Sequence, residues 1–430
     1  MSARNWTVQG IAELGSWILH RRHIWPSEHA AEDMIDEHIA CGIRHIVWEL
    51  GRSVLTYHSN LPNATCHGVG AHYDRFYPLA DSQRKAEMQV YHDRCQLRVA
   101  LTYCERRNCT VYGRLCMNRH YGPGSGQSVF ASEHPWWNEI TGDGKLDVSR
   151  LCYAIPEYRA ERVAILKEAA EIGCAGLVLD FCRQPPMVRY HSALTHPYRE
   201  RTGIDPRLIR VDEHDRYLDW CLYRAGYVTE LLRELKAALD PLRAKHGVAL
   251  PVQARIPNDG IEANVIAGLD VETWCSEGLI AEIALSELRW LPGYANWDDR
   301  PYIALGHRHG IRVFGSSNCL PVQQKGWSGQ VNPRGLNPLV LARRALRSLE
   351  QGADGLSLYQ SDTGCYLPGV SDAISTFHDE ASLRSYVGDS ENAERYPITD
   401  DNREYGIDNH SDSLENLARR VALGPEAAWV

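Results

Sequence analysis

The chain contains 430 residues, with 46 lysines and arginines against 55 aspartates and glutamates, which gives a formal net charge of −9. This acidic balance argues against nucleic-acid binding, which needs a basic surface, and no apolar run of 18 or more residues is present to span a membrane. Because the first residues also lack the apolar segment of a secretion signal, we expect a cytoplasmic protein.

The cysteine and aromatic contents narrow the class of protein further. The 13 cysteines are odd in number and form no Cys-x-x-Cys pair, so we expect reduced and mostly buried thiols rather than disulfides. The 12 tryptophans and 21 tyrosines supply amphipathic rings of the kind that stack on sugars, although such rings also fill large cores.

Strand and helix patterns alternate along most of the chain. The predicted strands are residues 15–20, 45–50, 110–117, 176–180, 251–256, 280–286, 311–315 and 354–359. The predicted helices are residues 26–41, 82–107, 156–172, 212–244, 271–274, 301–309 and 337–351. Alternating elements imply a parallel sheet, because parallel neighbours need a crossover connection.

Eight such units favour a closed barrel over an open, doubly wound sheet. Several strands are continuous apolar runs, as expected when both faces of a sheet are covered. We therefore predict a (β/α)8 TIM barrel with long βα loops over residues 1–375, closed by pairing of 15–20 with 354–359. Residues 376–430 are polar and acidic, and we expect a C-terminal extension on the barrel with a short helix at 414–421.

The loops that follow the strands carry the active site in a barrel, so polar residues at strand ends are the candidates. Three carboxylates qualify as catalytic groups: Glu49, Asp180 and Glu287. Asp180 is the strongest, because it ends an apolar run and a carboxylate facing the barrel interior is costly to bury unless it is paired or used. The substrate-binding candidates are Tyr57, His58, Asn118, His120, Arg183, Arg189, His191, Arg255, Trp290, Asn318 and Asp362.

Each of the three carboxylates also has a purely structural interpretation. Asp180 could form an ion pair with Arg183 or Arg255, Glu287 could be an exposed loop acid, and Glu49 could orient an arginine. A metal site is a further alternative, built from the scattered histidines His20, His23, His58, His67 and His72. Because no His-Glu-x-x-His or similarly tight spacing occurs, we expect neither a metal nor another cofactor.

Two segments resemble a known kind of protein. Residues 153–159 read Tyr-Ala-Ile-Pro-Glu-Tyr-Arg, and residues 176–186 read Gly-Leu-Val-Leu-Asp-Phe-Cys-Arg-Gln-Pro-Pro. Both resemble poorly characterised glycoside-hydrolase-like barrels of environmental bacteria, and the likeness extends over most of residues 40–360. The resemblance implies a glycosidase-type barrel with Asp180 and Arg183 in its site, and it leaves the second carboxylate open.

These observations together predict hydrolysis of a glycosidic bond by two carboxylates. Asp180 would be the nucleophile or base, Glu287 the general acid, and Glu49 a reserve for either role. The arginines at the barrel mouth suggest an acidic sugar such as a uronide or sulfated unit, unless they pair with the mouth carboxylates instead.

Two alternatives stay open at this point. One is a metal-dependent isomerase or lyase that acts on a sugar acid, and the other is a carbohydrate-binding barrel without catalysis. The expected partner is a carbohydrate substrate, with no nucleic acid or membrane, and assembly into a homo-oligomer is left open.

Overall fold

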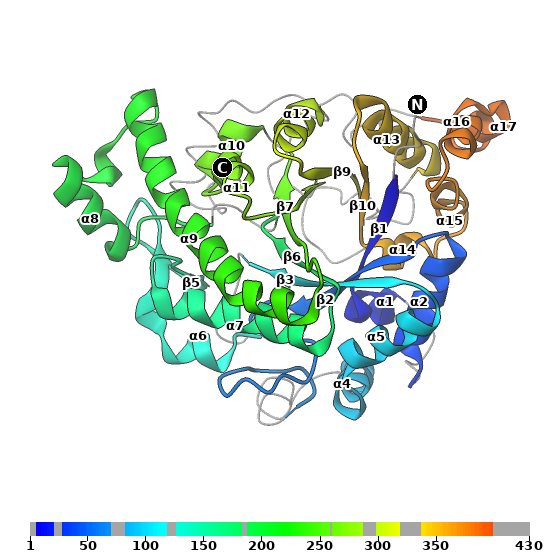
Figure 1. The fold of residues 1–430 in the computed structure, drawn as a ribbon, viewed down its shortest axis with the longest axis horizontal. Coiled ribbons are helices and arrows are strands. Elements are labelled where there is room, and N and C mark those ends of the chain that lie inside the picture. The colour runs from blue at the N-terminus through cyan, green and yellow to red at the C-terminus, as the bar shows by residue number, and fades with distance from the viewer. Residues whose placement is uncertain are drawn as a thin grey trace.

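The computed structural model describes residues 6–20, 28–69, 82–117, 126–182, 187–258, 260–286, 298–318 and 337–398. The barrel strands are β1 (Thr7–Ala12), β2 (His45–Gly51), β3 (Thr110–Cys116), β6 (Gly176–Asp180), β7 (Val252–Pro257), β8 (Glu282–Ser286), β9 (Arg312–Asn318) and β10 (Gly355–Tyr359). Neighbouring strands are all parallel, and β1 pairs with both β2 and β10, so the sheet closes on itself (Figure 1). The predicted TIM barrel is confirmed.

The prediction for the first strand is wrong. Residues 15–20 belong to helix α1 (Leu14–His20), and the strand that pairs with β10 is β1, just before it. Leu14, Trp17 and Ile18 are buried at the i, i+3, i+4 spacing of a helix face, and this spacing is the signal that the strand assignment overlooked. The eighth strand is placed as predicted.

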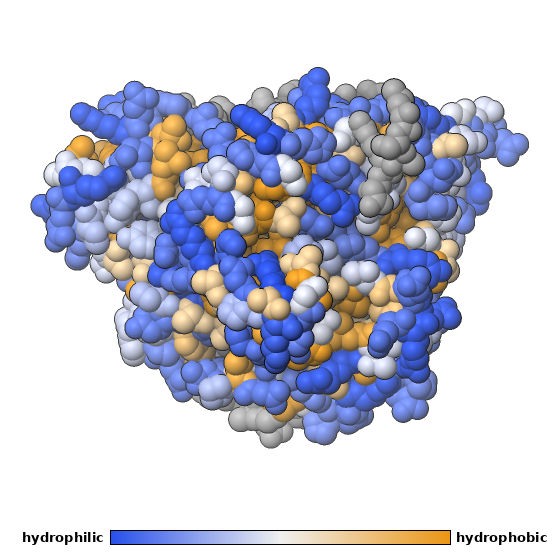
Figure 2. Space-filling view, in the orientation of Figure 1, coloured by the Kyte–Doolittle hydropathy of each residue, from blue (hydrophilic) through white to orange (hydrophobic). Residues whose placement is uncertain are grey.

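The helices cover the outside of the barrel and each buries one face. Around the barrel they are α1, α2 (Ala30–Ala40), α4 (Ser82–Asp93), α5 (Gln96–Arg106), α7 (Pro156–Ile172), α9 (His214–His246), α10 (Ile261–Ile266), α11 (Val271–Ser276), α12 (Arg300–Arg308) and α13 (Pro338–Gln351). The single helix predicted for residues 82–107 is interrupted between α4 and α5, where Cys95 is extended. In Figure 2 the outer surface of these helices is mostly hydrophilic, as amphipathic helices require. None of the helices within the described residues combines the length and apolarity needed to cross a bilayer.

Two additions to the barrel lie on different sides of it (Figure 1). One follows β3 and β6 and comprises α6 (Val129–Glu133), the 3-10 helix η1 (Pro135–Trp137), the antiparallel pair β4 (Asn138–Ile140) and β5 (Leu146–Leu151), α8 (Ser192–Thr202) and the 3-10 helix η2 (Pro206–Leu208). The other follows β10 and comprises α14 (Ser361–Gly364), α15 (Val370–Ile374), α16 (Glu380–Gly388) and α17 (Ser390–Arg395). Helix α16 packs on α13 through buried Leu383 and an ion pair between Arg384 and Glu350. The short helix predicted at 414–421 lies outside the described residues.

The seam between the first and last strands has no room for a side chain at Gly355. A Cβ atom there would collide with the carbonyl oxygen of Thr7 and with the ring of Phe314. We expect Gly355→Ala to lower the free energy of unfolding by about 1–3 kcal/mol, the usual range for overpacking a core, as measured by urea denaturation.

The matched control is Gly226→Ala in the interior of α9, where an added Cβ meets nothing within 4 Å. This change should raise stability by roughly 0.5–1 kcal/mol, since alanine is the better helix former. Equal effects of the two substitutions would contradict a tightly closed seam.

Candidate active site

The upper layer of the barrel interior is charged, whereas beneath it an apolar cluster lies beside the buried polar side chains of Gln9, Gln253 and Glu282. On β3 and β6, Arg114 and Asp180 follow Tyr112 and Val178 by two residues and therefore point to the same face of each strand. Tyr112 and Val178 pack with three side chains from β1, β2 and β10: Ile11, Val47 and Tyr359. Because all eight strands are parallel, the charged layer lies at their common C-terminal rim.

Asp180, the last residue of β6, is completely buried and its two carboxylate oxygens are both engaged. Oδ1 accepts hydrogen bonds from Nη1 of Arg255 at 2.9 Å and from the backbone nitrogen of Cys182 at 3.0 Å, and Oδ2 accepts one from Nη1 of Arg114 at 2.6 Å. Burial by itself raises the pKa of the Asp180 carboxyl, but the two guanidinium groups outweigh burial and hold the pKa well below its usual range.

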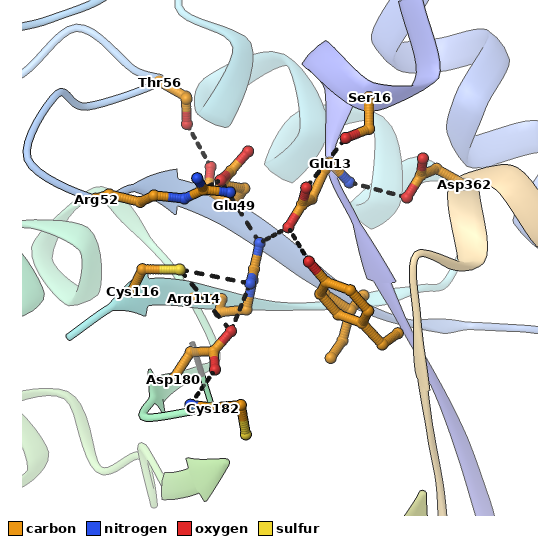
Figure 3. A network of polar contacts seen from close by, with 12 residues as sticks. Glu13, Ser16, Glu49, Arg52, Thr56, Arg114, Cys116, Asp180, Cys182 and Asp362 are labelled. Atoms are coloured by element: carbon orange, nitrogen blue, oxygen red, sulfur yellow. Dashed lines mark hydrogen bonds and ion pairs between the residues drawn. The ribbon is translucent and has the colours of Figure 1, made fainter. Parts of the chain in front are cut away.

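A single guanidinium group joins carboxylates from three parts of the barrel (Figure 3). Besides its bond to Asp180, Arg114 contacts Oε1 of Glu13 through Nη2, and the same nitrogen lies 3.6 Å from Oε1 of Glu49. Arg255 completes the group through Asp180 and through a hydrogen bond of 2.5 Å from its Nη2 to the hydroxyl of Ser286. We call Glu13, Glu49, Arg114, Asp180 and Arg255 the Arg114 network.

The carboxylates of this network differ in their openness to solvent. The side chain of Glu49 is 13% exposed, compared with 4% for Glu13 and 0% for Asp180. A second cation, Arg52, lies with its Nε 3.9 Å from Oε1 of Glu49. Glu49 is therefore the carboxylate of the Arg114 network that a substrate reaches most easily.

Glu13 was not among the predicted site residues. It follows β1 directly, and the misplacement of the first strand hid its position at the rim. Its backbone nitrogen donates to Oδ1 of Asp362 at 3.3 Å, and its Oε2 accepts from the hydroxyl of Ser16 at 3.1 Å. A polar residue directly after the strand pattern Val-x-x-Ile-Ala is the signal that would have revealed it.

Asp362 lies beside Glu13 in the short helix α14 and is only 1% exposed. Burial, followed by the negative charge of Glu13, raises the pKa of the Asp362 carboxyl well above its usual range. The hydroxyl of Thr363 lies 3.4 Å from Oδ2 of Asp362. Two neighbouring buried carboxyl groups cannot both ionise cheaply, and this is the physical reason for the upward shift of the Asp362 pKa.

The turn that presents Asp362 is fixed by its surroundings. Gln360 has a φ of 52°, a left-handed conformation that residues with side chains seldom adopt. Oγ of Ser361 lies 2.7 Å from Nε2 of the buried His38 in α2 and 3.1 Å from the carbonyl oxygen of Ile11 in β1. Such strain persists only where surrounding contacts determine the conformation, and here it orients Asp362 toward Glu13.

Two predicted substrate-binding residues on the second βα loop are engaged with outer helices. The hydroxyl of Tyr57 donates to Oε2 of Glu168 in α7 at 2.8 Å, and Nε2 of His58 lies 2.6 Å from the carbonyl oxygen of Tyr91 in α4. The structure therefore does not bring Tyr57 and His58 to the Arg114 network, and their contacts anchor the loop.

Two further candidates hold the addition that follows β3. Nη1 of the buried Arg189 lies 3.3 Å from Oδ2 of Asp147 in β5. Nε2 of His191 lies 2.9 Å from the carbonyl oxygen of Trp136, and Nδ1 of His191 accepts from the backbone nitrogen of Ala193 at 3.1 Å. Arg189 thus joins the loop after β6 to β5, and His191 joins it to η1.

The structure does not describe the side chains of six predicted site residues. Asn118, His120, Arg183, Glu287 and Trp290 lie outside the described residues, and for Asn318 only its backbone position at the end of β9 is described. Among the described residues, no three His, Cys, Asp or Glu side chains are grouped as a metal ion would require.

Comparison with known proteins shows the fold. No protein-family model and no curated protein matches the sequence. The β-galactosidase of the psychrophilic Marinomonas ef1 superposes with a TM-score of 0.51 and 11% identity over 94% of this chain. The cold-adapted β-galactosidase of Rahnella sp. R3 superposes with a TM-score of 0.52 and 11% identity over 99% of this chain.

A third structure, α-L-fucosidase isoenzyme 2 from Paenibacillus thiaminolyticus, has a TM-score of 0.49 and 13% identity over 92% of this chain. The aligned region spans 62%, 61% and 51% of the Marinomonas, Rahnella and Paenibacillus chains, so this chain corresponds to only part of each. At these identities the two β-galactosidases show that the barrel fold is shared.

The ionic contacts of Asp180 lead to a prediction about stability. Asp180→Asn leaves Arg114 and Arg255 buried close together without the anion that separates them. Because an uncompensated buried charge costs roughly 3–5 kcal/mol, we expect a loss of that size in the free energy of unfolding, measured by urea denaturation. The exposed pair of Asp212 and Arg210 supplies the control, since Asp212→Asn should leave the denaturation midpoint unchanged. Unaltered stability of Asp180→Asn would show that Asp180 does not hold the network together.

Proposed function

We propose that the protein is a glycoside hydrolase whose reacting groups are the carboxyl groups around Arg114. The observation that carries the proposal is the gathering of Glu13, Glu49, Asp180 and Asp362 at the C-terminal rim of a closed parallel barrel. Glycosidic bonds are hydrolysed by two carboxyl groups in opposite protonation states, one acid and one base or nucleophile. The shared fold with two β-galactosidases supports the same choice.

Glu49 is the best candidate for the ionised partner. It is the most exposed carboxylate of the Arg114 network and lies beside two cations, Arg114 and Arg52. Cations next to a carboxylate favour its charged form, which is the form that attacks a sugar carbon or activates a water molecule. This role agrees with the prediction of Glu49 as a catalytic group.

The pair formed by Glu13 and Asp362 is the best candidate for the acid. Glu13 approaches the same nitrogen of Arg114 as Glu49 does, and Asp362 lies beside Glu13 (Figure 3). The raised pKa of Asp362 keeps a proton in this pair, and that proton can pass to the departing glycosidic oxygen. Glu13 and Glu49 both contact Nη2 of Arg114, and such closeness favours the short separation of a retaining enzyme, roughly 5–5.5 Å, over the roughly 6.5–9.5 Å of an inverting one.

Asp180 serves this mechanism best as the anion that orients Arg114 and Arg255. Its carboxylate accepts from Arg114, Arg255, the backbone nitrogen of Cys182 and the thiol of Cys116, so attack by Asp180 would first require breaking an ion pair. The prediction that Asp180 is the nucleophile remains the competing assignment, and the variants below separate the two. The role of Glu287 as the general acid stays a prediction.

The substrate remains to be identified, and the structure bears on the acidic-sugar prediction. Arg255 and Arg114 are both bound to Asp180, and Arg189 is paired with Asp147. These three arginines are thus engaged by carboxylates of the chain itself, which supports a neutral sugar over a uronide at the Arg114 network.

The proposal is tested with p-nitrophenyl glycosides of neutral sugars and of the matching uronic acids. We expect the purified protein to release nitrophenol from at least one neutral glycoside, and Glu49→Ala to reduce this rate by roughly 10²–10⁴-fold or more. Added azide should restore part of the activity of Glu49→Ala, because a small anion can occupy the space of the missing carboxylate. Glu262→Gln, which removes an exposed acid on α10, should match the wild type.

Three outcomes would change the assignment. Turnover of no glycoside by the wild type would overturn the proposed function. Azide rescue of Asp180→Ala, but not of Glu49→Ala, would return the role of nucleophile to Asp180. Preference for the uronides would restore the acidic-sugar prediction.

A second prediction concerns the proton on Asp362. An unfolded aspartate ionises near pH 3.9, whereas the folded protein keeps Asp362 protonated to a higher pH, so this group lowers stability as the pH rises through that interval. Asp362→Asn removes the titration. We therefore expect the variant to lose less stability than the wild type between pH 4 and pH 8, while its turnover falls at least 10²-fold.

The measurement is the free energy of unfolding at several pH values for both proteins, so that contributions from other groups cancel. Parallel curves for the two proteins would contradict a proton held on Asp362. Full turnover by Asp362→Asn would remove Asp362 from the acid pair.

A further inference from the structure

The segment between β3 and α7 exposes several large apolar side chains. Of the eight large hydrophobic side chains that are exposed in the described part of the chain, four come from this one segment: Val129, Trp136, Leu146 and Val148. The segment belongs to a βα connection and therefore lies on the same side of the barrel as the Arg114 network. The exposed apolar side chains of this segment are therefore the candidates for contact with a ligand.

Trp136 dominates this surface. Its residue is 65% exposed, and it is the sole aromatic among those eight side chains. An indole gains far more from burial than it does from contact with water, so its exposure carries a cost that a ligand would remove.

The exposed indole is mounted on a rigid base. The carbonyl oxygen of Trp136 is held by His191 at 2.9 Å, and the backbone nitrogen of Cys152 donates to the carbonyl oxygen of Trp137 at 2.8 Å. The ring of His134 stacks on that of Trp137, with centroids 3.8 Å apart and planes at 10°, and lies 5.8 Å from the ring of Trp136. The backbone that carries the Trp136 indole is therefore fixed before a ligand arrives, which reduces the entropy that binding has to remove.

A polar group accompanies the ring. Nδ1 of His134 lies 2.7 Å from the carbonyl oxygen of Phe130, which fixes the imidazole. The other ring nitrogen, Nε2, has no hydrogen-bond or ion-pair partner within the part of the chain that the structure describes. A flat apolar face beside one hydrogen-bonding nitrogen matches a pyranose, which offers C–H groups on its face and hydroxyl groups on its edge.

We propose that Trp136 and His134 form a subsite for a pyranose unit of a carbohydrate chain, outside the Arg114 network. This inference rests on the proposed function, because a carbohydrate chain held at the rim can extend toward the carboxyl groups. A protein partner is the less suitable occupant. Stable protein interfaces bury roughly 1,200–2,000 Å² in total and are anchored mainly by aromatic and arginine side chains, whereas Trp136 is the sole aromatic side chain among the large hydrophobic ones exposed in this segment.

The test is electrophoresis of the native, full-length chain in gels that contain a soluble polysaccharide: galactan, glucomannan, xylan, β-glucan or polygalacturonate. The wild type should be retarded by at least one neutral polysaccharide. Trp136→Ala should weaken that binding at least tenfold, as judged from mobility against polysaccharide concentration, and Trp136→Phe should retain part of it. The matched control is Leu208→Ala, which removes an even more exposed apolar side chain from η2 and should bind like the wild type.

Four outcomes would overturn the subsite. They are absence of retardation of the wild type in every gel, equal retardation of Trp136→Ala, equal loss in Leu208→Ala, and concentration-dependent self-association in sedimentation that Trp136→Ala abolishes. The last outcome would assign the surface to a second copy of the chain. Hydrolysis of p-nitrophenyl glycosides by the wild type is measured separately, so failure of the subsite is distinguishable from failure of the proposed function.

Discussion

Arg114 is the residue on which the barrel mouth depends. Removing a guanidinium and a carboxylate from water costs several kcal/mol for each ion, and this cost is recovered only when every charge has partners in good geometry. Arg114 meets that condition by contacting Glu13, Glu49 and Asp180 at once, while Arg255 completes the coordination of Asp180. A core of apolar side chains would be at least as stable, so the retention of buried charge here favours chemistry over stability as its reason.

The arrangement of charges around Arg114 gives neighbouring carboxyl groups different electrostatic environments. Asp180 and Asp362 are both buried aspartates at the rim, yet their pKa values move in opposite directions. Burial raises the pKa of both groups. Arg255 and Arg114 lower the pKa of Asp180, whereas the carboxylate of Glu13 raises the pKa of Asp362 further. The pKa values of two buried aspartates thus move apart because their neighbours differ.

The sequence was sufficient to predict the barrel but only part of its mouth. Alternation of elements and apolar runs located seven of the eight strands, because those segments are long and bounded by clear helices. The strand prediction failed at β1, where a short strand precedes a helix with similar residues. Because of that error, Glu13 was not recognised as a residue at the rim. Asp180 and Arg255 were placed at the rim correctly, and the ion pair between them was among the interpretations considered.

The partners of these residues were harder to predict, since they depend on how distant loops fold back. Tyr57 and His58 follow a strand end like the true rim residues, but their loop turns toward α7 and α4. Asp362 was predicted to bind substrate; its nearness to Glu13 arises from a left-handed residue and a contact with His38 that no spacing in the sequence reveals.

The barrel closes where its first and last strands meet, and the acid pair lies across that seam. Glu13 and Asp362 are 349 residues apart in the chain, and Trp6 reaches Phe377 across the same boundary. During synthesis, β1 therefore waits with one edge unpaired until β10 has left the ribosome, a period in which exposed strand edges invite wrong pairing. Glu13 and Asp362 cannot come together before that moment. A nascent chain that stops short of β10 therefore contains Glu49 and Arg114 but lacks the proposed acid pair.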